Sequence, residues 1–187
     1  RNNTQDERKF PMVSINISAR QFSENGFVDQ VKKVFKETHI EPGMVEFEVT
    51  ETLVMDDVEH TIKVLNTLKE IGLRFAMDDF GTGYSSLAQL KKLPVDTLKI
   101  DRSFVCDIEN DANDYQIIEA IVAMAHKLGL DVVAEGIETE EQLNLIKLAG
   151  CDLGQGYLFS KPVAPDQLML EVVKQIHHDE VTNHISG

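Results

Sequence analysis

The chain has 187 residues, 42% of them hydrophobic, which is enough for one substantial core and favours a single domain. Its 32 acidic and 18 basic residues give a formal net charge of −14, which excludes a broad basic surface for large nucleic acids. The two cysteines lack CxxC spacing, and no apolar run reaches the roughly 20 residues that span a bilayer. We therefore expect a cytoplasmic domain, although a longer parent protein could carry an inner-membrane anchor.

Short apolar runs alternate with amphipathic stretches along the chain, a pattern typical of strand–helix–strand units and a parallel sheet. Six strands are predicted, at residues 12–17, 45–50, 74–78, 97–100, 131–134 and 153–158. Helices are predicted at 58–71 and 117–128, each ending before a glycine, and from the capping box of Thr139 and Gln142 to Ala149. The pattern alone fits both an open doubly wound sheet and a part of a (β/α) barrel.

Each predicted strand ends on polar side chains. They are Asn16, Glu48 and Glu51, Asp78 and Asp79, Asp101, Glu135, and Gln155. Because the carboxyl ends of parallel strands meet at one face of the sheet, these side chains can share a single site despite their separation in sequence. The alternative for any one of them is that it only caps the following helix. Independent capping is a poor explanation for five or six strands in succession.

A shared site would bring several carboxylates together, which is costly unless cations neutralise them. Oxygen ligands without a cluster of cysteine or histidine favour hard cations such as Mg²⁺ or Mn²⁺. Two such ions, roughly 3.5 to 4 Å apart, are a common arrangement for cleaving phosphodiesters. Asp78 and Asp79 are adjacent in an apolar context, and Asp78 is the natural candidate to bridge the two ions.

Six motifs resemble, in the same order, those of the EAL domain family of bacterial cyclic di-GMP phosphodiesterases. They are SINISARQF (14–22), EVTE (48–51), DDFGTGYSSL (78–87), KIDRSFV (99–105), AEGIET (134–139) and GQGYLFSKP (154–162). The resemblance runs through essentially the whole chain and implies an α/β fold, a modified (β/α)8 TIM-type barrel with about six of its eight strands present. It also implies metal-dependent hydrolysis of cyclic di-GMP to linear pGpG.

The EAL motif that names the family is absent from the sequence. We therefore expect residues 1–187 to form a single EAL domain that lacks its first two strands, with a polar lead-in at 1–9 and a C-terminal tail at 179–187. An unclosed barrel would expose two sheet edges, and the first metal would lose a carboxylate ligand. This predicts little or no turnover by the chain alone.

The resemblance assigns roles to the strand-end residues by position. The matching metal ligands are Asn16, Glu48 and Asp78 for one ion and Asp78 with Asp79 for the second, either Mg²⁺ or Mn²⁺. Lys99 matches the lysine that orients the attacking water, and Glu135 the carboxylate that acts as general base or second-metal partner. The surrounding assignments are Asp101, Gln155 and Glu138 as a polar shell around the site or as contacts to the substrate, and Glu51 as the residue that steadies the loop at 80–87.

Two other functions stay open at this point. The first is a degenerate EAL domain that binds cyclic di-GMP as a receptor without cleaving it. The second is an interaction module that needs neither metal nor nucleotide. The retained acidic residues argue against both. The resemblance further implies a homodimer, and a parent protein with sensory or diguanylate cyclase domains.

Overall fold

One parallel sheet organises the computed structural model, which describes residues 12–83, 87–165 and 167. Its six strands follow one another in chain order, each hydrogen-bonded to the next. They are β1 (Val13–Asn16), β2 (Val45–Thr50), β3 (Arg74–Phe80), β4 (Thr97–Ile100), β5 (Asp131–Glu135) and β6 (Leu153–Gln155). All six predicted strands are confirmed, and every pairing between neighbours is parallel.

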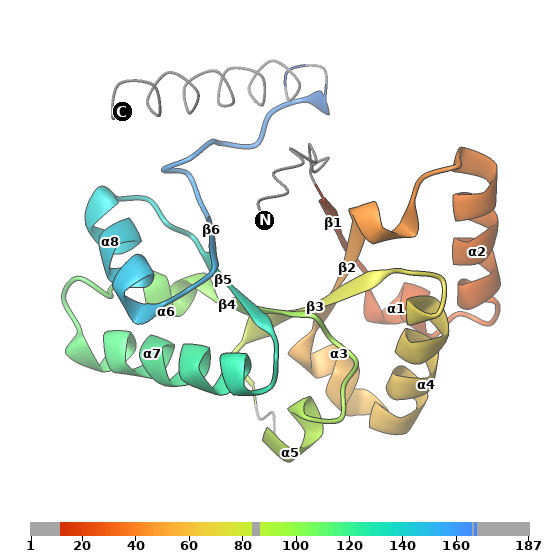
Figure 1. Cartoon of the computed structure of the whole chain (residues 1–187), viewed down its shortest axis with the longest axis horizontal. Helices are drawn as coiled ribbons and strands as arrows, with labels where there is room; N and C mark the ends of the chain where they lie inside the picture. Colours follow the sequence, from red (N-terminus) through yellow and green to blue (C-terminus); the bar gives the residue numbers. More distant parts are fainter. Residues whose placement is uncertain (1–11, 84–86, 166, 168–187) are drawn as a thin grey trace, which may run out of the picture.

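The sheet is curled rather than flat. Figure 1 shows the strands following an arc from β1 round to β6, with the helices on the convex side of the arc. A doubly wound sheet would carry helices on both faces, whereas a barrel carries them only on its outer face. The curvature therefore decides between the two architectures that the sequence pattern left open, in favour of a part of a barrel.

Eight α-helices connect the strands within the described ranges. They are α1 (Ala19–Phe22), α2 (Phe27–Thr38), α3 (Glu51–Asp56), α4 (Val58–Lys69), α5 (Leu87–Leu90), α6 (Arg102–Cys106), α7 (Ala112–Lys127) and α8 (Glu140–Ala149), and a short 3-10 turn, η1, covers Pro42–Met44. The predicted helices correspond to α4, α7 and α8. The capping box of α8 is confirmed, since Gln142 N donates to Thr139 Oγ1 and the Gln142 side chain accepts from Thr139 N.

Two boundaries differ from the prediction for physical reasons. Helix α7 begins earlier, at Ala112, because the Asp111 side chain accepts a hydrogen bond from Asn113 N and caps it. Strand β6 ends at Gln155, because the chain then turns back so that Leu158 N donates to Ile137 O. No helix in the part of the chain that the structure describes is long and apolar enough to cross a bilayer.

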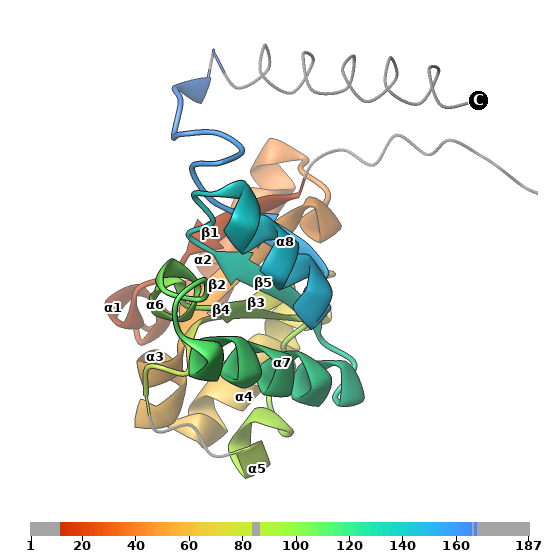
Figure 2. The ribbon, with the colours of Figure 1, turned by 90° about the vertical axis from the view of Figure 1, so that its left-hand side faces the viewer.

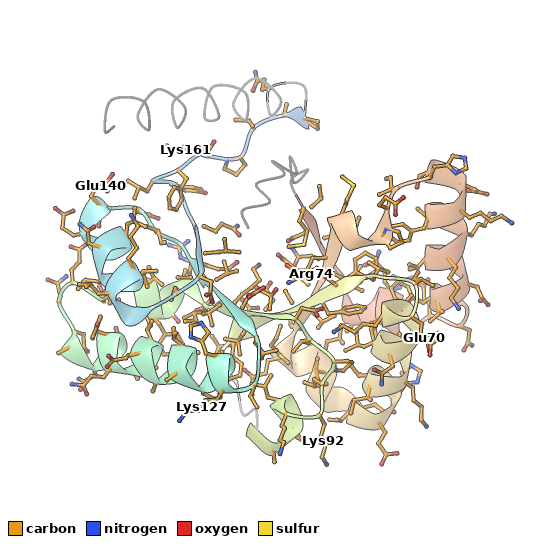
Figure 3. The ribbon with its side chains drawn as sticks, viewed as in Figure 1. Glu70, Arg74, Lys92, Lys127, Glu140 and Lys161 are labelled. Atoms are coloured by element: carbon orange, nitrogen blue, oxygen red, sulfur yellow. The ribbon has the colours of Figure 1, made fainter. Side chains whose placement is uncertain are left out.

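The core lies between the sheet and the surrounding helices. Strand β2 shows how the sequence achieves this, because Val45, Phe47 and Val49 alternate with two glutamates, and the Phe47 ring packs against Phe27 of α2 and Phe75 of β3. On the other half, α7 packs against β5 and α8 (Figures 1 and 2). Figure 3 shows the side chains filling the space between the layers. The apolar face of the sheet therefore packs against the helices on the convex side, and polar residues project from the concave face.

Replacing Phe75 with alanine is expected to lower the free energy of unfolding by about 3 to 5 kcal/mol, because this fully buried ring would leave a cavity between β2 and β3. Urea denaturation followed by circular dichroism measures the change. Ile117→Ala is the matched control, since Ile117 lies on α7 with 41% of its surface exposed. Similar losses in the two variants would contradict this account of the core.

Candidate active site

Lys99 of β4 is the centre of a buried charged cluster on the concave face of the sheet. Its Nζ lies 2.8 Å from Glu48 Oε1, 3.1 Å from Asp78 Oδ1 and 2.6 Å from Glu135 Oε1. These three carboxylates come from β2, β3 and β5, and the Lys99 side chain is only 5% exposed. One positive charge therefore faces three negative ones in a region with little access to water.

The register of the sheet brings these side chains together. Glu48 pairs with Asn16 of β1, and Thr50, on the same strand as Glu48, pairs with Asp78. Parallel partners project from the same face, so Asn16 lies beside Glu48 at the open edge of the cluster. Glu46, which the sequence prediction did not include, lies one layer deeper and accepts a 2.7 Å hydrogen bond from Thr97 Oγ1. It is a buried structural acid outside the cluster.

A backbone irregularity allows two neighbouring aspartates to contribute to one site. In a regular strand Asp78 and Asp79 would point to opposite faces. The pairing of β3 with β4 shifts between Met77 and Phe80, and Asp79 has a φ of 54°, a left-handed conformation that is uncommon outside glycine. Burial raises the pKa of Asp79, and repulsion from Asp78 and Asp101 raises it further, as expected for a carboxylate close to the cluster. Strain of this kind is typical of functional sites.

The cluster is short of positive charge. Burial opposes the charge on Lys99, but hydrogen bonds to Glu135 and Glu48 outweigh burial and raise its pKa above the usual range. Burial raises the pKa of Glu135, and repulsion from Asp78 and Glu48 adds to this, against the lowering effect of Lys99. Burial, followed by repulsion from Asp78, also raises the pKa of Asp79. Additional cations would relieve this imbalance.

The donor atoms fit a hard divalent cation. Asp78 Oδ1 is buried and, although 3.1 Å from Lys99 Nζ, accepts no hydrogen bond of acceptable geometry. Asn16, Glu48 and Asp79 add further oxygen donors, the type that Mg²⁺ and Mn²⁺ prefer. Across residues 12–83 and 87–165, no three acidic, histidine or cysteine side chains are already arranged around a common ion position. In this arrangement the Lys99 ammonium lies between the carboxylates instead.

Glu51, the first residue of α3, lies against the loop that follows β3. Its carboxylate accepts a 3.4 Å hydrogen bond from Gly81 N and is almost fully buried. The loop approaches so closely that a Cβ on Gly83 would lie 2.6 Å from Glu51 Oε1, which only glycine allows. This contact is consistent with the predicted loop-steadying role. Residues 84–86 of the predicted loop lie outside the described residues.

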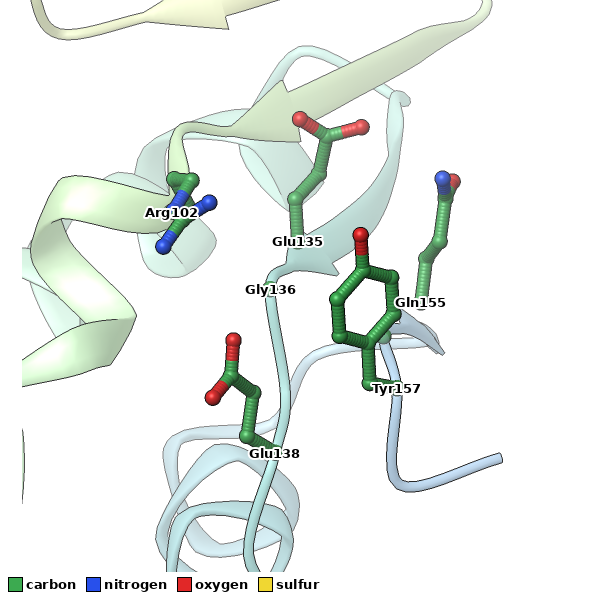
Figure 4. A pocket seen from close by; sticks show the side chains of 7 residues that line it. Arg102, Glu135, Gly136, Glu138, Gln155 and Tyr157 are labelled. Carbon is green, nitrogen blue, oxygen red and sulfur yellow. The ribbon is translucent and has the colours of Figure 1, made fainter. Parts of the chain in front are cut away.

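The predicted polar shell separates into two parts. Asp101 caps α6, because its Oδ1 accepts hydrogen bonds from Ser103 N and Oγ; burial opposes the effect, but these bonds lower the pKa of Asp101. Gln155 and Glu138 instead line a pocket beside Glu135 (Figure 4). Neither of them contacts Lys99. Asp101 therefore caps a helix, which was the alternative role considered for each strand-end residue. It also lies near enough to Asp79 to raise the pKa of that carboxylate.

Comparison with known proteins gives the family. Residues 1–162 match the family model described as EAL domain. The chain belongs to the EAL domain family. Its curled sheet is therefore a part of the modified (β/α)8 TIM-type barrel that the sequence predicted, with six strands in the described residues.

Named relatives agree with this assignment. The chain is 46% identical over 151 residues to the cyclic di-GMP phosphodiesterase NbdA of Pseudomonas aeruginosa, covering 81% of this chain and 19% of NbdA. Among solved structures, the phosphodiesterase PaMucR in complex with c-di-GMP matches with a TM-score of 0.81 and 41% identity, over 84% of this chain and 64% of PaMucR. BlrP1 of Klebsiella pneumoniae, solved with manganese and cy-diGMP, matches with a TM-score of 0.75 and 34% identity, over 81% of this chain and 39% of BlrP1. The chain spans about a fifth of the length of the curated relatives that it matches.

Two residues near the cluster were not predicted from the sequence as site residues. Arg102 and Tyr157 line the pocket beside Glu135 together with Gln155 and Glu138. Each directly follows a strand-end motif, Arg102 after Asp101 and Tyr157 after the Gln155-Gly156 turn. Their positions just after strand ends could have indicated that these two residues lie near the site. An arginine or tyrosine in such a turn is, however, most often a solvated side chain.

Proposed function

We propose that this chain carries the catalytic site of a phosphodiesterase that hydrolyses cyclic di-GMP to linear pGpG with two bound Mg²⁺ or Mn²⁺ ions. The observation that carries the proposal is the Lys99 cluster, which joins Glu48, Asp78 and Glu135 at the carboxyl ends of three strands. The names of NbdA and PaMucR, both phosphodiesterases, support the substrate and the reaction class. The manganese complex of BlrP1 supports a divalent ion.

The residues have separate tasks in this proposal. Asn16, Glu48 and Asp78 would hold one ion, and Asp78 with Asp79 the second. Bound divalent ions lower the pKa of a coordinated water and stabilise charge on phosphate oxygens. The adjacent position of the two aspartates, made possible by the bulge at Asp79, suits Asp78 to serve both ions.

Lys99 and Glu135 act on the water that attacks phosphorus. The Lys99 ammonium can donate to the water oxygen and orient it, while Glu135 Oε1, 2.6 Å from Lys99 Nζ, lies where it can accept a proton of that water. The water oxygen forms a bond to phosphorus, and the bond from phosphorus to one ribose 3′ oxygen breaks. The leaving oxygen takes up a proton, so the product is the linear dinucleotide with a 5′ phosphate.

Chelation of divalent ions is expected to abolish pGpG formation by the native protein that contains these residues, and added Mn²⁺ or Mg²⁺ to restore it. Chromatography of the nucleotide products measures the rate, and calorimetry measures binding of cyclic di-GMP under the same conditions. Ion-independent turnover would contradict the metal assignment. Binding without turnover at any ion concentration would establish the receptor alternative, and absence of both would leave an interaction module.

A further inference from the structure

The end of β3 presents the second aspartate of the cluster in a strained conformation. Asp79 has a φ of 54°, in the left-handed region that residues with a Cβ seldom occupy. Its backbone oxygen accepts hydrogen bonds from Thr82 N at 3.3 Å and from Thr82 Oγ1 at 2.9 Å. Hydrogen bonds between exposed groups add little net stability, because the same groups can bond to water. Contacts from outside the turn at 79–82 are therefore needed to hold Asp79 in this conformation.

Gly81 is the residue at which two other elements contact this turn. Gly81 N donates to Glu51 Oε2 of α3 at 3.4 Å. A Cβ built on Gly81 would lie 2.8 Å from Phe104 Cε2 and 3.0 Å from Phe104 Cζ, so any larger residue would have to displace the ring. The Phe104 side chain of α6 therefore lies directly against the Gly81 backbone. The turn is held by a hydrogen bond to α3 and by a ring from α6.

Helix α6 holds the Phe104 ring in place. Its first turn is capped by Asp101, whose Oδ1 accepts a hydrogen bond from Ser103 N, and Val105 fixes the helix to the core as a fully buried side chain. Phe104 is only partly buried, at the margin of the core. Successive side chains on a helix point about 100° apart, so Val105 faces the core while Phe104 faces the turn. Removing the ring would free the turn without emptying the centre of the core.

We propose that Phe104 is a positioning residue for Asp79: by resting on Gly81, it restricts the turn so that Asp79 keeps its left-handed backbone and its carboxylate stays close to the cluster. Phe104 acts only through the backbone of Gly81. The inference rests on the proposed function, in which Asp78 and Asp79 hold the second ion. Truncating the ring should weaken the second ion in particular, because the proposed ligands of the first ion lie on β1, β2 and β3 before the turn.

Titration of the native protein with Mn²⁺, followed by calorimetry and by the electron paramagnetic resonance of free Mn²⁺, counts the bound ions and gives the affinity of each. Phe104→Ala is expected to weaken the second ion about 10-fold or more and to change the first by less than about threefold. Phe104→Leu restores most of the apolar volume above Gly81 and should recover most of this loss. In turnover assays, the Mn²⁺ concentration for half-maximal rate should rise by the same factor in Phe104→Ala, with a nearly native rate at saturating Mn²⁺.

Val105→Ala is the matched control, because it removes a fully buried side chain from the same helix and leaves the ring on Gly81. Thermal unfolding is measured for each variant, and Val105→Ala should lower the unfolding temperature at least as much as Phe104→Ala. Both of its ion affinities should stay within about threefold of the native values, since its effect is on packing alone. Equal weakening of the second ion in the two variants would show that Phe104 acts only through stability, and the inference would be wrong.

A double variant tests whether Phe104 acts through Asp79. Asp79→Asn removes the carboxylate charge, and adding Phe104→Ala to it should cause little further loss in ion affinity, because both changes affect the same ligand. Additive losses would contradict the inference. A native protein that binds two Mn²⁺ ions, with affinities unchanged by Phe104→Ala, would overturn the inference and leave the proposed function standing. A native protein that binds no Mn²⁺ would refute the proposed metal site, and this inference with it.

Discussion

Replacing Lys99 with methionine is expected to reduce cyclic di-GMP turnover by at least about 100-fold and to destabilise the ion-free protein by about 3 to 5 kcal/mol. The reason for the second effect is that Glu48, Asp78 and Glu135 would lose the only cation within 4 Å of them among the described residues. Methionine keeps much of the apolar volume of the lysine side chain, so the loss reports on charge rather than on packing.

The measurement for this variant combines two readouts. Urea denaturation in EDTA gives the change in stability, and product chromatography with Mn²⁺ gives the rate. Lys92→Met is the control, because Lys92 is an exposed lysine near α5 that points away from the sheet (Figure 3). A Lys99→Met protein as stable and as active as the control would show that the buried ammonium has neither role.

Divalent ions should distinguish the two roles of Lys99. We expect Mg²⁺ to raise the stability of Lys99→Met more than that of the native protein, because the cations would neutralise carboxylates that no longer have a partner. Turnover should stay low even with the ion bound, since the group that orients the water is missing. Full rescue of turnover by Mg²⁺ would restrict Lys99 to a structural, charge-balancing function.

The strands could be predicted because each is a short apolar run followed by polar residues, and parallel strands must bring those polar ends to one face. This reasoning placed Glu48, Asp78 and Glu135 at a common site, and the family resemblance added Lys99. The structure brings these four into contact. It could not show that Lys99 would be their centre. That depends on the curl of the sheet and on side-chain lengths, which no linear pattern contains.

Features that depend on tertiary contacts were harder to predict. From the sequence, any of the strand-end residues could have capped the following helix. Only the hydrogen bonds from Ser103 to Asp101 identify Asp101 as such a cap. The pocket beside Glu135 depends on how closely Gly136 and Gly156 let neighbouring segments of the chain approach each other. The metal ligand set and the homodimer stay predictions.

Glu135→Gln is the substitution that best separates chemistry from binding. The amide is nearly the same size as the carboxylate, and its oxygen can still accept a hydrogen bond from Lys99, which lies 2.6 Å from Glu135 Oε1. It cannot take up a proton at neutral pH. If Glu135 is the general base, turnover should fall by roughly 100- to 10,000-fold while the affinity for cyclic di-GMP stays within about threefold of the native value.

The comparison uses Glu140→Gln, an equally conservative change at an exposed position of α8, which should match the native protein in rate and affinity. Because Glu135→Gln leaves the substrate intact, calorimetry with Mn²⁺ present can measure its affinity directly. Loss of both turnover and ion-dependent binding would mean that Glu135 acts chiefly as a metal partner. Unchanged turnover would remove Glu135 from the mechanism and leave the bound ions as the source of the activated water.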